Sequence, residues 1–237
     1  MVSVVLPDSV TAVLDQARAA LLDTIHIGVL VPWANMVVEA ELPRFGLDRV
    51  VFHYARLVPA SRTTSLDQRF LRELNAAVPA AVSELSRLPL AGTLLACTSA
   101  GFIETEERLP FPVVSAFDAL VTTLSRMSID RIVLVAPYQR WLTAIEAHAF
   151  MDRGIMVLAQ SSLDRDDEYS RISAAEIQGM LAQLGPTELG SAQAIVLSCT
   201  GWPTLGLLAG LENSFGMPVL SSNLAMAIHA MTSDGSR

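Results

Sequence analysis

Short apolar runs that end in clusters of small polar residues recur along the chain. Most of them have the length of strands that are buried on both faces, as in parallel sheets. The runs occupy residues 25–31, 92–96, 113–114, 131–135, 194–197 and 218–220. Longer segments with helical periodicity occupy residues 66–88, 117–127, 141–153 and 174–184. Strands that alternate with helices predict βαβ units and therefore an α/β fold with parallel sheets.

The same order of features occurs twice along the chain. In each half one strand runs into a proline-containing loop, a second into a Cys-Thr pair, and a third into a turn that carries serine. Pro32 and Cys97 are 65 positions apart, and Pro137 and Cys199 are 62 positions apart. An internal repeat of this kind indicates two copies of one α/β unit.

We therefore expect two similar three-layer α/β/α halves related by a pseudo-twofold axis. The approximate boundaries are residues 1–128 and 129–237, with the segment from residue 205 onwards crossing back to the first half. Matching loops of the two halves would meet at their interface, where ligands usually bind. The active site is expected in the cleft between the halves.

Composition narrows the class of protein. Of the 237 residues, 51% are hydrophobic, which is enough for a sizeable core. Polar residues interrupt each apolar run before it reaches the length of a membrane span. The net charge is −8 and the basic residues are dispersed, so neither nucleic acid nor a membrane is an expected partner. Residues 1–20 lack the pattern of an export signal, which favours a cytoplasmic protein.

The sequence carries no signature of a metal site or of a nucleotide cofactor. The four histidines have no metal-ligand spacing, and no Cys/His cluster accompanies them. Gly28 is not followed by the further glycines of a dinucleotide-binding turn, and no Gly-Lys-Ser/Thr phosphate loop occurs. We expect an enzyme that needs no metal and no cofactor.

The two cysteines occupy matching positions of the repeat. Two cysteines in a chain of 237 residues without an export-signal pattern favour individual thiols over a disulfide framework. A lone cysteine is ordinarily a small buried hydrophobe, but the symmetry of Cys97 and Cys199 favours a catalytic pair. Both follow strands at the sheet edge where α/β proteins bind ligands. Backbone N–H groups and a helix start after each cysteine are expected to stabilise a thiolate.

Such a pair of thiols has two uses. It can act as base and acid on opposite faces of a substrate carbon, or as nucleophile and proton donor at an activated double bond. Either reaction develops negative charge, and neutral donors that hold a small carboxylate would also stabilise that charge. Residues of this kind on the neighbouring loops are Asn35, Thr98, Ser99, Tyr138, Thr200, Ser222 and Asn223.

Around these residues the sequence resembles the Asp/Glu racemase superfamily, and within it the maleate cis-trans isomerase and arylmalonate decarboxylase branch. The resemblance extends from residue 25 to about residue 231. Its blocks are Ile27-Gly28-Val29-Leu30-Val31-Pro32 with Asn35 and Glu39, Ala96-Cys97-Thr98-Ser99-Ala100, Ala136-Pro137-Tyr138, residues 154–163, Leu197-Ser198-Cys199-Thr200, and residues 216–223.

The resemblance implies a cofactor-independent enzyme with a small carboxylate substrate. Cys97 matches the nucleophile of maleate isomerases, which adds to the alkene, and Cys199 matches the partner that handles the proton. Asn35 and Tyr138 match residues that hold the substrate carboxylates. The remaining expected substrate-binding residues are Pro32, Trp33, Thr98, Ser99, Thr200 and Gly201. Arylmalonate decarboxylases keep only the second cysteine, so the presence of both favours an isomerase or a racemase.

Some positions depart from the family pattern. Trp33 and Trp202 stand in the two loops, and they suggest an apolar part to the substrate. Residues 164–168 are acidic, which is typical of a solvated loop but also compatible with a lid over the site. An acidic residue of 166–168 stands where the family has a further asparagine, and it would repel a dicarboxylate.

Two alternatives to the isomerase or racemase stay open at this point. One is a decarboxylase of arylmalonate type with Cys199 as the proton donor, and the other is a non-catalytic relative that binds a carboxylate. A homodimer is an expected assembly, with the apolar stretch 205–211 as a candidate interface.

Overall fold

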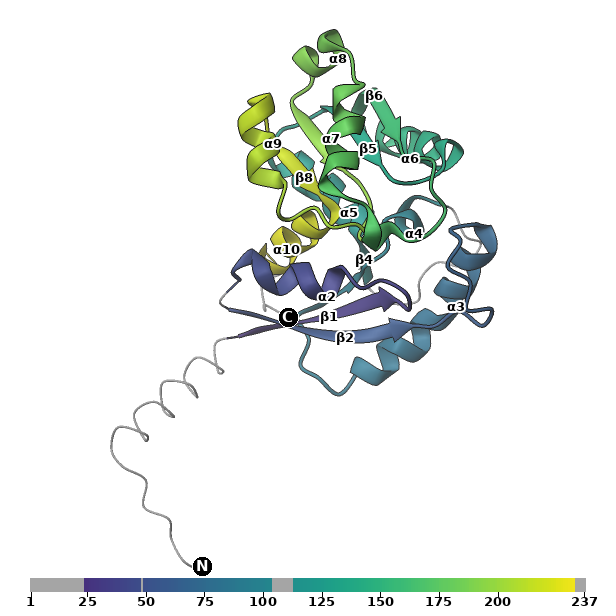
Figure 1. Ribbon diagram of the computed structural model, residues 1–237. Helices are drawn as coiled ribbons and strands as arrows, with labels where there is room; N and C mark the ends of the chain where they lie inside the picture. Colours follow the sequence, from purple (N-terminus) through teal and green to yellow (C-terminus); the bar gives the residue numbers. More distant parts are fainter. Residues whose placement is uncertain (1–23, 48, 104–112, 233–237) are drawn as a thin grey trace, which may run out of the picture.

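The computed structural model describes residues 24–47, 49–103 and 113–232, which form two four-stranded parallel sheets (Figure 1). The strand orders are β2-β1-β3-β4 and β6-β5-β7-β8, so the second sheet repeats the order of the first. This equivalence confirms the predicted α/β fold of two similar halves. The strands are β1 (Ile25–Pro32), β2 (Val50–Leu57), β3 (Gly92–Leu95), β4 (Val113–Ser115), β5 (Arg131–Ala136), β6 (Met156–Ser162), β7 (Ala194–Leu197) and β8 (Val219–Ser221).

Helices flank both sheets and include each of the four that periodicity predicts. The helices are α2 (Val38–Glu41), α3 (Gln68–Leu85), α4 (Ser99–Phe102), α5 (Ala116–Arg126), α6 (Arg140–Asp152), α7 (Ala174–Ala182), α8 (Pro186–Ser191), α9 (Leu208–Phe215) and α10 (Ser222–Thr232), with 3₁₀ turns η1 (Leu42–Phe45) and η2 (Tyr169–Arg171). Side-chain caps fix several starts: Asp67 accepts from the N–H of Phe70, and Ser115 accepts from the N–H of Asp118.

The two sheets share a hydrophobic core. Val29 of the first sheet and Ile132 of the second lie in one buried cluster with Phe117 of α5 and Met226 of α10. Helix α10 also contacts η1 of the first half. Because α5 and α10 join the halves, the division at residues 128 and 129 stays a prediction.

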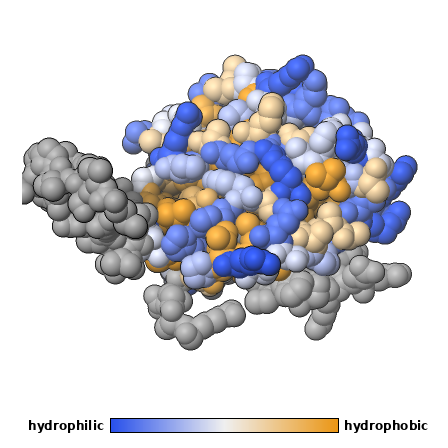
Figure 2. Space-filling view, turned by 90° about the horizontal axis from the view of Figure 1, so that it is seen from below, coloured by the Kyte–Doolittle hydropathy of each residue, from blue (hydrophilic) through white to orange (hydrophobic). Residues whose placement is uncertain are grey.

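The expectations about export, membranes and assembly depend on features outside the core of the fold. The prediction for residues 1–20 lies outside the described residues. Within the described parts of the chain, no helix is long and apolar enough to span a membrane. On the face seen in Figure 2, apolar side chains form small patches among hydrophilic ones, and the homodimer stays a prediction.

Candidate active site

The carboxyl ends of strands from both sheets surround a cavity of about 350 Å³. Parallel α/β sheets bind ligands at this edge. Trp33, Ser222 and Asn223 do not line the cavity, but the other nine of the twelve predicted site residues do: Pro32, Asn35, Cys97, Thr98, Ser99, Tyr138, Cys199, Thr200 and Gly201. The fold therefore brings together residues that are up to 169 positions apart in the chain.

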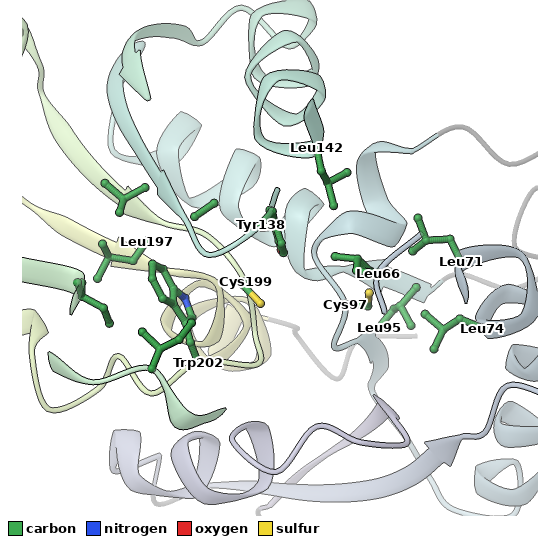
Figure 3. Packing of buried hydrophobic residues seen from close by; sticks show 14 of the residues in the cluster. Leu66, Leu71, Leu74, Leu95, Cys97, Tyr138, Leu142, Leu197, Cys199 and Trp202 are labelled. Carbon is green, nitrogen blue, oxygen red and sulfur yellow. The ribbon is translucent and has the colours of Figure 1, made fainter. Parts of the chain in front are cut away.

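Cys97 stands two residues after the end of β3 and is 7% exposed. Its Sγ lies 3.4 Å from Oγ of Ser99, and the N–H groups of Ser99 and Ala100 also interact with it. Burial nevertheless raises the pKa of the Cys97 thiol, because the loss of hydration destabilises the thiolate more than these hydrogen bonds stabilise it. Figure 3 shows Leu66 beside this cysteine, and both residues line the cavity.

Cys199 is held in an unusual backbone conformation. Its φ is +113°, a region that L-residues rarely adopt, and its Sγ points toward the side of the cavity where Cys97 and Tyr138 lie (Figure 3). The N–H of Gly201 donates to Sγ at 3.3 Å, and the Tyr138 side chain forms a second hydrogen bond to it. Burial raises the pKa of this thiol to about 12 in spite of these donors.

The N–H groups of the turns do lower the pKa of each thiol, as expected, but burial outweighs them and the net shift of both pKa values is upward in the free protein. The helix start is also confirmed for only one cysteine: α4 begins at Ser99, whereas the next helix after Cys199 begins at Leu208. The donors around Cys199 belong to a turn and to Tyr138. Desolvation dominates at both sites because each thiol lies in a buried cluster with aliphatic side chains.

Hydrogen bonds across the interface of the halves connect the two cysteine loops. Asn35 donates to Oγ1 of Thr200 at 3.1 Å, and this hydroxyl donates to the carbonyl oxygen of Ala96 at 2.8 Å. Ser222 accepts from the Thr98 hydroxyl and from the N–H of Cys199, both at 3.0 Å. Each of these two groups of hydrogen bonds includes residues of both halves, so neither half could form the candidate site alone.

The two tryptophans do not line the cavity, which corrects their expected role. Trp202 is fully buried in the core, and the Trp33 indole donates to the carbonyl oxygen of Thr63 at 3.0 Å. The apolar wall comes instead from Met36, from Leu66 just before α3, and from Phe70 in the first turn of α3. Sequence reasoning missed the latter two, although they belong to the helical pattern that it recognised.

Part of the acidic segment lies at the cavity. Asp167 and Glu168 line it, and so does Arg171, which pairs with Glu168 at 2.9 Å. Tyr169 packs edge-on against Tyr138 with ring centroids 6.0 Å apart. These contacts place the segment against the site, and its proposed motion as a lid stays a prediction.

A buried carboxyl group next to the site was not anticipated from the sequence. Glu146 of α6 is fully buried and accepts a hydrogen bond from the hydroxyl of Ser198, the residue before Cys199. Burial raises the pKa of Glu146 to about 8. A glutamate within an otherwise apolar helix face is the signal that could have indicated it. Among the residues that the structure describes, no group of three or more His, Cys, Asp or Glu is placed to bind a metal ion.

Comparison with known proteins agrees with this architecture. The family model for Asp/Glu/hydantoin racemases matches residues 34–230. The chain therefore belongs to the Asp/Glu/hydantoin racemase family.

Individual relatives indicate which enzymes of this family the chain resembles. Maleate isomerase of Alcaligenes faecalis is 25% identical over 224 residues, covering 84% of this chain and 87% of that protein. A Nocardia farcinica maleate cis-trans isomerase variant, solved with a covalently bound succinylcysteine intermediate, superposes with a TM-score of 0.78 at 24% identity, covering 89% and 92% of the two chains. An arylmalonate decarboxylase variant in its liganded form has a TM-score of 0.73 at 19% identity, with 89% and 94% covered. The similarity to the maleate isomerases shows that the chain is an isomerase.

Proposed function

We propose that the chain catalyses cis-trans isomerisation of a small unsaturated dicarboxylate without a cofactor, with maleate as the first candidate. Racemisation of a small carboxylate is the second reaction open to the same pair of thiols. The observation that carries the proposal is the convergence of Cys97 and Cys199 on one cavity from equivalent strand ends. The maleate isomerases among the relatives support the choice of substrate.

In the proposed reaction the thiolate of Cys97 adds to one alkene carbon. A C–S bond forms, and the π electrons move to the other carbon and onto its carboxylate. The Cys199 thiol gives its proton to that carbon, and the new single bond rotates. The Cys199 thiolate then removes the proton, the C–S bond breaks, and the trans alkene leaves. The succinylcysteine bound in the Nocardia relative is the adduct that such an addition would produce.

The other cavity residues have roles that fit this reaction. Asn35 and Tyr138 would hold the carboxylates, and the turns around Thr98, Ser99 and Gly201 would stabilise the developing enolate. Because burial keeps both thiols protonated in the free protein, the Cys97 thiol must first release its proton to solvent water, and the thiolate that remains adds to the alkene. The N–H groups next to it are the donors for that thiolate.

Proton NMR with maleate in deuterated water tests the proposal. Wild-type protein should form fumarate, and Cys97→Ala and Cys199→Ala should each lose roughly 10³-fold or more of the turnover. Circular dichroism of both variants checks that they remain folded. Near-wild-type turnover by either variant would refute the two-thiol mechanism, and untouched maleate would move the search to bulkier acids.

Decarboxylation of a malonate-type acid is the alternative that one structural feature favours. The apolar wall of Met36, Leu66 and Phe70 offers space for a hydrophobic substituent. In this reaction Cys199 is the proton donor and Cys97 is incidental. Carbon dioxide release from an arylmalonate that survives Cys97→Ala but not Cys199→Ala would favour it over isomerisation. A cytoplasmic location is also part of the proposal.

A further inference from the structure

The side chain of Glu41 belongs to the first half and is buried. Within the described residues, all of its hydrogen bonds are to groups of the second half. Glu41 ends α2 and is 5% exposed. Its Oε1 accepts from the N–H groups of Thr204 and Leu205 at 2.7 and 2.8 Å. Its Oε2 accepts from Nδ2 of Asn223 at 2.8 Å and from the Thr204 hydroxyl at 3.3 Å. A carboxylate can accept all four bonds because it has no donor of its own.

These partners belong to the loop that carries Cys199. Thr204 and Leu205 follow this cysteine within the same connection between β7 and α9. Asn223 also donates to the carbonyl oxygen of Thr200 at 3.3 Å, so it ties Glu41 to the residue directly after Cys199. The carboxylate therefore fixes both ends of the 200–205 loop.

Cys199 needs such a restraint because its φ is +113°. Strained backbone conformations persist only where the surrounding structure holds them, and they relax when that support is removed. The N–H of Cys199 is held by Ser222 from one side, and Glu41 holds the chain that follows. Relaxation at this residue would change the direction of its Cα–Cβ bond and so the position of Sγ relative to the cavity.

We propose that Glu41 is a positioning residue, which holds the 200–205 loop so that the Cys199 thiol faces the cavity. The proposal rests on the proposed function insofar as Cys199 handles a proton there. It assigns Glu41 a role beyond joining the halves, because its loss should change the reactivity of one cysteine more than that of the other.

Glu41→Gln is the direct test, since the side chain keeps its size but turns an acceptor into an amino group that faces donors. With maleate as substrate, kcat should fall roughly 100-fold while KM changes less than about threefold. Iodoacetamide labelling at pH 8, followed by mass spectrometry, should show Cys199 modified at least about tenfold faster and Cys97 changed less than about threefold.

Leu42→Ala is the matched control, because Leu42 is the next residue, is fully buried and packs in the core shared by the halves. It loses packing without touching the loop, and it should keep kcat and the labelling ratio of the two cysteines. If Glu41→Gln does not fold, Glu41→Asp replaces it, because aspartate keeps the carboxyl group but is one methylene shorter. This variant should change kcat and the labelling ratio in the same direction by a smaller factor.

The proposal is overturned if a folded Glu41→Gln keeps both kcat and the labelling ratio within threefold of wild type. The same holds if Leu42→Ala reproduces its changes, or if Glu41→Gln does not fold and Glu41→Asp behaves as wild type. If wild-type protein leaves maleate and other diacids unchanged, the proposed function fails, and the labelling ratio still decides the role of Glu41.

Discussion

The buried carboxyl group of Glu146 should make the stability of the protein depend strongly on pH. Its pKa is about 8 in the folded protein, against 4.5 for the ordinary side chain, because burial disfavours the charged form. The folded state therefore binds more protons than the unfolded state between these values, and the free energy of unfolding falls as the pH rises through this range. Above about pH 8 the loss is complete.

The size of this effect follows from the displacement of the pKa. At about 1.4 kcal/mol for each pH unit, the interval from 4.5 to about 8 corresponds to a loss of about 5 kcal/mol. That is comparable to the total stability of many domains. Glu146→Gln retains an oxygen for the Ser198 hydroxyl and cannot ionise, so its stability should lack this component.

Urea unfolding at pH values from 5 to 9 measures the difference between the two proteins. Wild type should lose stability relative to Glu146→Gln as the pH rises, and the variant should be the more stable protein at pH 9. Glu84→Gln removes a carboxylate from an exposed position of α3 and should follow wild type. Parallel curves for wild type and Glu146→Gln would refute the assignment of a neutral, buried carboxyl group.

Three further predictions concern the site and its support. Gly101→Ala should destabilise the protein by about 1–3 kcal/mol in urea unfolding, because a Cβ would lie 2.1 Å from Oγ of Ser115; an unchanged midpoint would contradict this packing. Cys199→Gly should be about 1–2 kcal/mol more stable than Cys199→Ala in the same assay, since glycine accepts the positive φ, and equal stabilities would argue against strain. Because burial raises the pKa of both thiols, iodoacetamide labelling of Cys97 and Cys199 should accelerate continuously above pH 8, whereas a rate that levels off below pH 8 would show ionised thiols.

Local patterns were sufficient to predict most of the framework. The helix predicted at 117–127 is α5, and the strand predicted at 194–197 is β7. Both are recognisable because hydrophobic periodicity reports directly on burial. Strand β2 was not recognised, since it lies at an edge of its sheet and carries partly buried polar residues such as His53 and Tyr54.

The repeat of the chain is sufficient by itself to place both cysteines at equivalent strand ends. Parallel strands carry their carboxyl ends to one edge, so matching sequence positions become matching sites in space. The repeat also indicates the loops of Asn35 and Tyr138, which line the cavity together with the thiols. It contains no information on the direction of individual loop side chains, and for this reason Trp33 and Trp202 were assigned to the cavity incorrectly.

Protonation and support of the site depend on contacts between distant parts of the chain. In the sequence, Glu41 looks like an ordinary glutamate of a helix, and its burial becomes evident only when the halves pack together. Glu41 meets Thr204 across 163 positions, and no local pattern encodes such a contact. The upward shift of the two thiol pKa values could not be predicted from the sequence for the same reason. Desolvation depends on all the atoms packed around each cysteine, and not only on its neighbours in the chain.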